Sequence, residues 1–386
     1  MRQFSVVIVV KNKEPGLLSI AESREKALVP LLNGTKIIDC YLSSVGAKEF
    51  GRVSVITEKD MTGVREHLVY HYNSSSIRVI HEANALDSLF HAFKSWKRSP
   101  VLLLRADGLL LPLWTEFIKF LKNLPEKNYT LRTHEKKLFG FLIQDTTVLH
   151  YLKNERERYQ TKGSSVDGMW ELISDALQRT SKTVEYHTRY DTLETVIDYY
   201  RLQFDLFHYF ENLAAQREFP PSTGIDEKDS ARITETGHVV DAYVSYSSTI
   251  EGFVKGSVIF PHVRVGKNAR VINSVIMGHN HIGSGASVIN TIICDNSELF
   301  SKVSPNIGEN ASIGEENSRG SNSTFSDYLH GGITLIGQNV EIPKEYKVSK
   351  NCYIASNTHR SLLKGQASVK AGETVLDART NHQENQ

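Results

Sequence analysis

From about Asp241 onward, an aliphatic residue recurs at every sixth position, and this repeat constrains the fold more than any other feature of the chain. Several of these residues precede a glycine, as in Val265-Gly, Ile282-Gly and Ile307-Gly. A period of six builds a parallel β-helix, in which the aliphatic side chains stack inward from coil to coil and the glycine lets the chain turn a corner. The sequence therefore predicts a β-helix domain over residues 233–375.

Two features interrupt or bound the repeat. Spacings of five and a polar insert, Glu315–Asp327, break the run, which resumes at Gly332. A polar tail follows at 376–386, and we expect its end to be disordered. Before the repeat, residues 218–232 are rich in Pro, Ser, Gly and charge, which indicates a linker.

The first 217 residues have a different pattern, in which short apolar runs alternate with stretches of helical periodicity. This pattern is typical of an α/β fold, a parallel sheet with helices on both faces. We expect strands over residues 4–10, 53–57, 77–80, 101–104 and 138–144, and helices over 61–70, 85–96, 114–121 and 196–207.

Composition narrows the functional classes. A chain of 386 residues with 40% hydrophobic content is long enough for two domains. A net charge of +1 gives no basic field for nucleic acid, and no run approaches the roughly 20 apolar residues that span a bilayer, so we expect a cytoplasmic protein. Cys40, Cys294 and Cys352 are isolated and have no metal-ligand spacing, which predicts buried thiols.

Residues 20–44, IAESREKALVPLLNGTKIIDCYLSS, resemble without a gap a block that opens the ADP-glucose pyrophosphorylases, and Ser257 to Ala269 resembles their hexapeptide repeat. The resemblance implies a Rossmann-like nucleotidyltransferase domain followed by a left-handed parallel β-helix. It also implies the activity of a glucose-1-phosphate adenylyltransferase, which joins ATP to glucose 1-phosphate.

The phosphate loop of that family is missing. The family places glycines and an arginine before the block, whereas this chain has Glu14 and Pro15, and Gly16 stands in the position of the arginine. A polyphosphate loop needs successive free backbone N–H groups, and proline removes one of them. Glu14 places a negative charge where a triphosphate would bind. The sequence therefore predicts a weakened or lost nucleotide site.

Four residues correspond to functional residues of the family. The resemblance implies that Lys26 contacts phosphate, that Arg24 and Asp167 lie at the substrate, and that Asp107 binds Mg²⁺ at the end of a strand. Three of them have a simpler alternative: Lys26 as a solvated or ion-paired lysine, and Asp107 and Asp167 as turn or capping residues.

Other parts of the catalytic half depart from the family. Thr192 stands where a second metal aspartate is expected, with Asp191 one position away. Between Asp107 and the strand at 138–144 the chain is short, and the Glu-Lys-Pro lysine that holds glucose phosphate has no equivalent. His67 and His71 have the i, i+4 spacing of metal ligands, but the sequence offers no third ligand nearby.

Three hypotheses follow. The favoured one is a non-catalytic or weakly catalytic regulatory subunit in glycogen biosynthesis, a partner of a catalytic ADP-glucose pyrophosphorylase subunit or a homo-oligomer. The second is an active adenylyltransferase that uses Mg²⁺. The third is a sensor that binds a phosphorylated sugar through Lys26, Arg24 and Lys36 without turnover.

Overall fold

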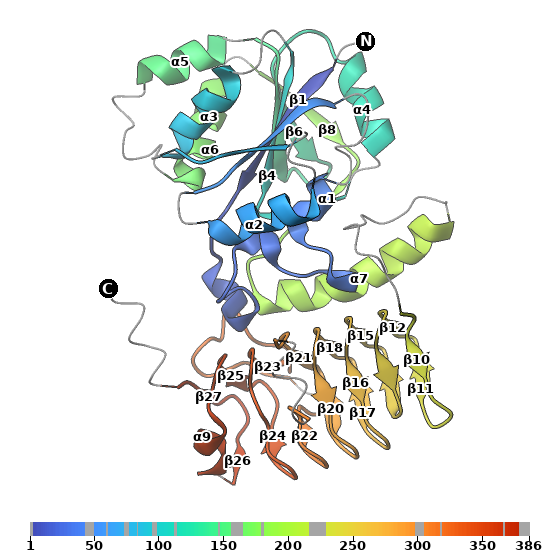
Figure 1. Ribbon diagram of the computed structural model, residues 1–386. Coiled ribbons are helices and arrows are strands. Elements are labelled where there is room, and N and C mark those ends of the chain that lie inside the picture. Colours follow the sequence, from blue (N-terminus) through green and yellow to red (C-terminus); the bar gives the residue numbers. More distant parts are fainter. Residues whose placement is uncertain are drawn as a thin grey trace.

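The computed structural model describes residues 3–42, 50–58, 61–72, 77–82, 84–94, 99–111, 114–145, 147–155, 165–178, 181–215, 229–297, 305–316, 319–365 and 367–377. Within these ranges, no helix is long and apolar enough to cross a membrane. An α/β domain lies above a β-helix, and the long helix α7 (Val196–Ala215) runs between them (Figure 1). Residues 218–228 of the predicted linker and 378–386 of the predicted tail fall outside the described residues, and Arg232 of the predicted linker belongs to the first strand of the β-helix.

The α/β domain contains a seven-stranded sheet and a separate two-stranded ribbon. The order in the sheet is β3-β2-β1-β4-β7-β6-β8, and its strands are β1 (Phe4–Val10), β2 (Phe50–Ile56), β3 (Ile77–Ile80), β4 (Val101–Ala106), β6 (Tyr129–Thr133), β7 (Leu138–Ile143) and β8 (Lys182–Tyr186). The ribbon pairs β5 (Gly108–Leu111) with β9 (Arg189–Thr192).

Strand β1 lies inside this sheet, between β2 and β4, and both of its faces are apolar. Val6, Ile8 and Val10 belong to one hydrophobic cluster, and Val7 and Val9 to another. Helices α3 (Ala85–Lys94), α5 (Thr147–Glu155) and α6 (Val166–Gln178) cover the second face, and α1 (Ile37–Leu42), α2 (Thr62–His71), α4 (Trp114–Asn123) and α7 pack in the first cluster. The prediction of helices on both faces is confirmed.

The expectation of an all-parallel sheet is wrong at one strand. β7 is antiparallel to both β4 and β6. A tight turn at Thr133–Lys137 joins β6 to β7, and so short a connection can only form a hairpin. Strand β6 was not predicted, because we assigned no element between the helix predicted over 114–121 and the strand predicted over 138–144.

The β-helix has three parallel sheets. The first sheet contains β10 (Arg232–Ile233), β13 (Thr249–Ile250), β16 (Arg264–Val265) and β19 (His281–Ile282). The second contains β11 (His238–Val240), β14 (Phe253–Lys255), β17 (Arg270–Ile272), β20 (Ser287–Ile289), β22 (Ser312–Ile313), β24 (Lys347–Val348) and β26 (Ser368–Val369). The third contains β12 (Tyr243–Val244), β15 (Val258–Ile259), β18 (Val275–Ile276), β21 (Thr291–Ile293), β23 (Thr334–Ile336), β25 (Tyr353–Ile354) and β27 (Thr374–Val375).

The coil geometry explains the irregular spacing and corrects one expectation. Val271 pairs with Val288, one coil of seventeen residues away, so each such coil contains two spacings of six and one of five. Gly266, Gly283 and Gly308 have no positive φ and do not make the corner, in contrast to Gly314. A Cβ on Gly283 would lie 2.7 Å from the Ile307 carbonyl oxygen, so this glycine permits close stacking of coils. Positive φ angles instead occur at residues such as Asn268 and Asn310.

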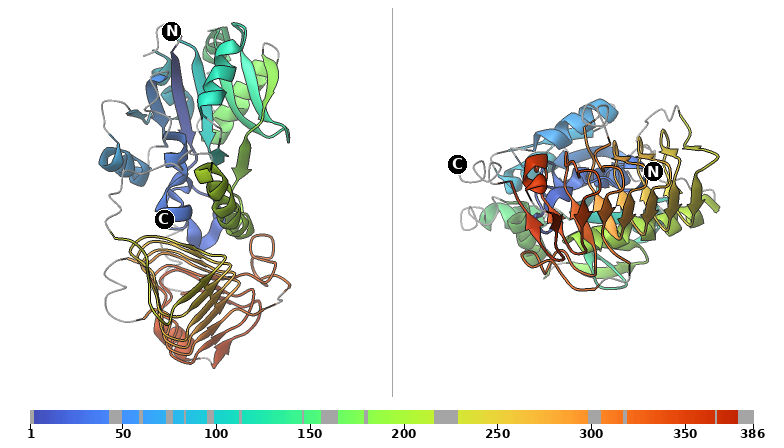
Figure 2. Two further views of the ribbon diagram at one scale, coloured as in Figure 1. Left: turned by 90° about the vertical axis from the view of Figure 1, so that its right-hand side faces the viewer. Right: turned by 90° about the horizontal axis from the view of Figure 1, so that it is seen from below.

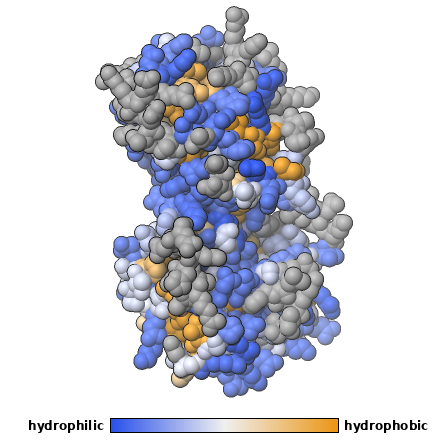
Figure 3. All heavy atoms as spheres, turned by 60° about the vertical axis from the view of Figure 1, so that its left-hand side comes forward, coloured by the Kyte–Doolittle hydropathy of each residue, from blue (hydrophilic) through white to orange (hydrophobic). Residues whose placement is uncertain are grey.

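The third sheet joins the two domains because it is apolar on both sides. Ile259 and Ile276 point into the β-helix core, whereas the next residues, Phe260 and Met277, pack in the hydrophobic cluster of the α/β domain. Fully burying such a side chain contributes about 1.5–3 kcal/mol. Figure 2 shows α7 lying along this side of the coils. On the face drawn in Figure 3, most of the coloured atoms are hydrophilic, and apolar atoms gather in separate patches.

Candidate functional site

The candidate site lies at the carboxyl ends of β1 and β4. These strands are parallel neighbours, and Val10 pairs with Ala106 in register. The segments that follow them, beginning at Lys11 and Asp107, therefore start at the same edge of the sheet, which is where ligands bind in open α/β folds. Asp167 lies in the first turn of α6 and contributes its side chain to the same site.

Lys26 is paired inside the protein. Its Nζ lies 3.0 Å from Glu14 Oε2, and Lys11 Nζ lies 3.2 Å from the same oxygen. The Lys26 residue is only 1% exposed. Burial lowers the pKa of Lys26, while its hydrogen bond to Glu14 and the charges of Glu14 and Asp107 act in the opposite direction. Glu14 thus supplies the negative charge that a bound phosphate would supply.

Asp107 is also paired inside the protein. Arg105 forms ion pairs with Asp107 and with Asp167, and its guanidinium lies over the ring of Trp170. The hydroxyl of Tyr190 donates a hydrogen bond to the other carboxylate oxygen of Asp107, and burial together with the Asp107 charge raises the pKa of Tyr190. Both oxygens of Asp107 therefore already have a partner.

One contact connects the ion pairs around Lys26 with those around Asp107, because Lys11 Nζ lies 3.9 Å from Asp167 Oδ2. We call the connected side chains the charge network. Its three cations are Lys11, Lys26 and Arg105, and its three anions are Glu14, Asp107 and Asp167. Their formal charges cancel. An incoming triphosphate would find no uncompensated positive charge within this set.

The donors of this site do not suit Mg²⁺. Mg²⁺ in nucleotide enzymes needs one or two free carboxylates beside the phosphates. Asp107 is held by Arg105 and Tyr190, and the second position of the family is Thr192. Among the described residues, no group of three or more His, Cys, Asp or Glu side chains could hold a metal ion.

Gly16 has no room for a side chain. A Cβ at this position would lie 2.1 Å from the carbonyl oxygen of Glu194 and 3.0 Å from Cδ1 of Tyr328. Tyr328 directly follows the polar insert of the β-helix, and its neighbour Leu329 is buried in the hydrophobic cluster of the α/β domain. The place of the missing arginine is thus filled by packed backbone and by an aromatic ring.

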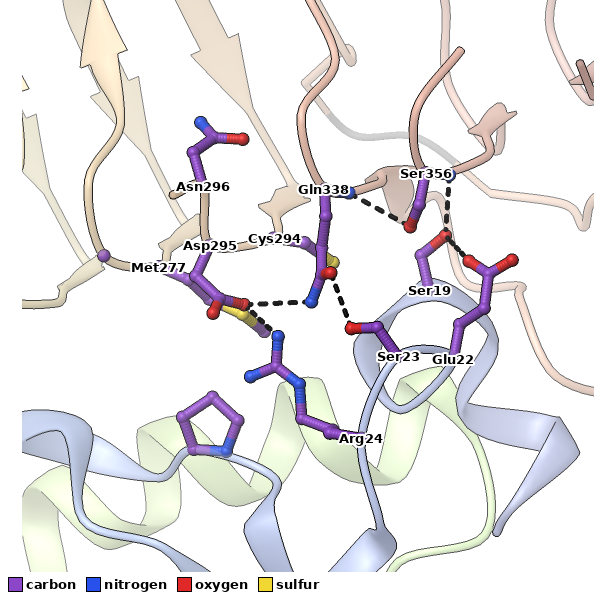
Figure 4. Close-up of polar contacts among 12 residues, drawn as sticks. Ser19, Glu22, Ser23, Arg24, Met277, Cys294, Asp295, Asn296, Gln338 and Ser356 are labelled. Carbon is purple, nitrogen blue, oxygen red and sulfur yellow. Dashed lines mark hydrogen bonds and ion pairs between the residues drawn. The ribbon is translucent and has the colours of Figure 1, made fainter. Parts of the chain in front are cut away.

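Arg24 lies elsewhere, at the junction of the two domains. Its Nη2 is 2.6 Å from Oδ1 of Asp295 in the β-helix, as Figure 4 shows. Gln338 Nε2 donates to Asp295 at 3.4 Å, and Ser23 Oγ donates to Gln338 Oε1 at 2.7 Å. Arg24 therefore connects the domains and does not join the charge network.

Asp39 and His67 form another internal contact. The buried carboxylate of Asp39 lies 2.7 Å from His67 Nε2 and accepts a hydrogen bond from the Tyr72 hydroxyl at 2.8 Å. The rings of His67 and His71 have centroids 4.5 Å apart. These contacts connect α1 to α2 and to Tyr72, which directly follows α2, and they give His67 a structural partner.

A cavity of about 340 Å³ lies between β9 and the first half of α7, and it does not belong to the charge network. Its charged lining includes Arg189, Asp191 and Asp205, and none of the six residues of the network. Arg189 forms ion pairs with both of these aspartates.

The sequence identified three members of the network: Lys26, Asp107 and Asp167. From the sequence we did not predict that Arg105 and Lys11 would be their counter-ions, and we interpreted Glu14 only as an obstacle to phosphate binding. A signal was available, because Arg105 precedes Asp107 by two residues at the end of a strand, so both side chains point to the same side.

Comparisons with known proteins agree with parts of this architecture. Residues 220–336 match the family described as GlmU-like, C-terminal hexapeptide. A glucose-1-phosphate adenylyltransferase of Pseudothermotoga lettingae is 37% identical over 179 residues, covering 44% of this chain and 40% of that protein. A protein of the same name from Mycoplasma mobile is 30% identical over 121 residues, covering 30% and 32%. The matches thus span less than half of these curated relatives.

Proposed function

We propose that this chain is a non-catalytic or weakly catalytic subunit that acts with a catalytic glucose-1-phosphate adenylyltransferase. The charge network is the observation that carries the proposal. Lys26 and Asp107, the residues that correspond to the phosphate and metal contacts of the family, are neutralised by Glu14 and Arg105.

Gly16 supports the same conclusion. An enzyme that transfers a nucleotidyl group needs cationic groups to stabilise charge on the phosphates in the transition state. The backbone of Glu194 excludes an arginine at position 16, so the side chain that would provide this charge cannot be accommodated.

The role we propose is regulatory. The retained α/β domain and β-helix provide surfaces for a catalytic partner, whose activity or effector response this subunit would change. The product of the catalytic partner, ADP-glucose, would supply glycogen synthesis. The partner and the pathway are parts of the proposal and rest on the resemblance to the adenylyltransferases.

The test measures ADP-glucose formation from ATP, Mg²⁺ and glucose 1-phosphate. The purified chain is assayed alone and is then titrated into the catalytic glucose-1-phosphate adenylyltransferase of the same organism. We expect no turnover alone and saturable stimulation of the enzyme. Turnover by the chain alone that disappears in Asp107→Asn would establish an active enzyme and contradict the proposal.

A sensor gives a third pattern, in which a phosphorylated sugar binds tightly without turnover and without any effect on the enzyme. Lys26→Met separates this result from regulation. It should abolish binding if Lys26 contacts phosphate, and it should leave stimulation unchanged if Lys26 only pairs with Glu14.

A further inference from the structure

Leu18 has a backbone conformation that is rare for a leucine. It lies in the 3₁₀ segment Pro15–Ile20, which we call the Leu18 loop, and has a φ of 47° and a ψ of −136°. A positive φ strains the backbone of a residue with a large side chain. Such strain persists only where the surrounding structure holds it, so the contacts of the neighbouring residues show what holds this loop.

Ser19 anchors the loop to the β-helix. Ser19 is fully buried, and its Oγ accepts a hydrogen bond from the backbone N–H of Ser356 at 3.1 Å and lies 2.8 Å from the Tyr353 hydroxyl. The same Oγ donates to Glu22 Oε2 at 3.1 Å. A hydroxyl has one donor and two acceptor sites, and with Tyr353 as a donor these contacts use all three. Figure 4 shows Ser19 facing Ser356 across the junction of the two domains.

The residues before Leu18 are held as well. Gly16 packs between the carbonyl oxygen of Glu194 and the ring of Tyr328, and Leu17 is fully buried. Because both Tyr328 and Ser356 come from the β-helix half of the chain, this half contacts the loop on both sides of Leu18.

The loop leads directly to the charge network. The N–H of Leu17 donates to the carbonyl oxygen of Glu14 at 3.0 Å, which closes one turn, and the carboxylate of Glu14 lies 3.0 Å from Lys26 Nζ. The backbone from Ser19 to Glu14 thus consists of the strained Leu18 and this closed turn. It contains no slack segment that could absorb a movement of Ser19.

We propose that Ser19 is a positioning residue that holds Glu14 on Lys26. Without its anchor, Leu18 would leave the strained conformation, and the loop would carry the Glu14 carboxylate away from Lys26. The Lys26 ammonium would then be open to an anionic group such as phosphate. The charge network would thus be an autoinhibitory contact that the β-helix keeps closed, and this inference rests on the proposed function, in which the network neutralises the site.

The experiment measures the rate at which acetic anhydride acetylates each lysine of the isolated full-length chain, with mass spectrometry to identify the modified residues. Ser19→Ala removes the anchor. The matched control is Ser23→Ala, because Ser23 Oγ donates to Gln338 Oε1 at 2.7 Å across the same junction but lies beyond the loop. Lys119, whose side chain is 62% exposed, is the internal reference for rate.

We expect Ser19→Ala to accelerate the acetylation of Lys26 by about tenfold, the change in an opening equilibrium that follows from the loss of one or two buried hydrogen bonds. Ser23→Ala should leave the rate at Lys26 unchanged. Lys36 interacts electrostatically with Arg24 and Asp295, and it reports on loosening of the whole junction. Equal acceleration at Lys26 and Lys36 would mean that the junction opens as a unit, and it overturns the inference.

Tyr353→Phe is a second variant that keeps the test decisive if Ser19→Ala does not fold. It removes one contact of Ser19 and keeps the ring that packs against Phe325. We expect acceleration at Lys26 in the same direction and by a smaller factor. An unchanged rate at Lys26 in every folded variant overturns the inference.

Inorganic pyrophosphate is the probe for the opened site. It should slow the acetylation of Lys26 in Ser19→Ala, and a rate that pyrophosphate does not change would overturn the claim that the freed lysine accepts phosphate.

The outcome of the labelling does not depend on a catalytic partner, because the chain is labelled alone. Protection of Lys26 in Ser19→Ala, with stimulation of the enzyme by the wild-type chain, overturns the inference and leaves the proposed function standing. Absence of stimulation by the wild-type chain overturns the proposed function even where Ser19→Ala releases Lys26.

Discussion

Glu14→Gln is the substitution that tests the charge network most sharply. It keeps the size of the side chain and removes the negative charge that Lys26 and Lys11 share. Lys26 is buried and cannot reach solvent, so its ammonium would remain without its nearest counter-ion. We therefore expect Glu14→Gln to lower the free energy of unfolding.

The magnitude follows from the exposure of the three side chains. Removing one partner of a buried ion pair costs about 3–5 kcal/mol. The Glu14 side chain is 13% exposed and Asp107 also favours the charged form of Lys26, so we expect about 2–4 kcal/mol. Loss of the contact with Lys11, whose side chain is 27% exposed, adds at most about 1 kcal/mol.

The matched variants make the reasoning refutable. Lys26→Met removes the buried charge while Glu14 keeps Lys11 at 3.2 Å, so it should cost no more than about 2 kcal/mol. The double variant replaces the pair by neutral groups and should be more stable than Glu14→Gln alone by about 2 kcal/mol.

Urea unfolding followed by tryptophan fluorescence is a suitable assay, because all three tryptophans lie in the first half of the chain and report on the α/β domain. Midpoints are compared at equal slope, which separates stability from a change in the unfolded state. A Glu14→Gln variant as stable as wild type, or less affected than Lys26→Met, would refute the claim that Glu14 is the internal counter-ion.

Three further predictions concern the loop and the domain junction. Gly16→Ala should lower the free energy of unfolding by about 1–3 kcal/mol or more in the same assay, because its Cβ meets the Glu194 carbonyl oxygen at 2.1 Å, and Gly16→Arg should not produce ADP-glucose synthesis. Burial and the charge of Arg24 lower the pKa of Lys36 to about 8, so competitive acylation should show Lys36 titrating near that pH; an amine with its ordinary pKa would contradict this. Arg24→Met should raise the pKa of Lys36 and, by removing the contact with Asp295, lower the melting temperature slightly.

Much of the fold could be predicted because it depends on local periodicity. The apolar run at β1 was predicted with its observed bounds, Phe4–Val10, and so was β3 at Ile77–Ile80. The six-residue repeat identified the β-helix, and the polar insert was correctly placed between β22 and β23. The three cysteines are buried, as predicted.

The site was harder to predict because its defining contacts are not local. Glu14 and Lys26 are twelve residues apart, and Arg105 and Asp167 sixty-two. Spacing alone cannot show that an acidic side chain will turn toward a buried lysine. The family resemblance identified Lys26 and Asp107, but only the packing of the edge of the sheet shows that each is already paired.

Arg24 illustrates the same limit from the other direction. It lies two residues before Lys26 in a block with a clear family resemblance, yet the two side chains make their contacts in different parts of the molecule. Lys26 begins a short 3₁₀ helix and points to the charge network, whereas Arg24 faces the β-helix. Proximity in sequence therefore did not imply a shared site.

The measurement that tests the central claim most directly is calorimetric titration of the isolated chain with ATP in the presence of Mg²⁺, and then with glucose 1-phosphate. A charge network that neutralises itself predicts no saturable binding of either ligand, because neither a free cation nor a free carboxylate remains among its six residues. Saturable binding of ATP that Lys26→Met abolishes would contradict the account and show that phosphate displaces Glu14.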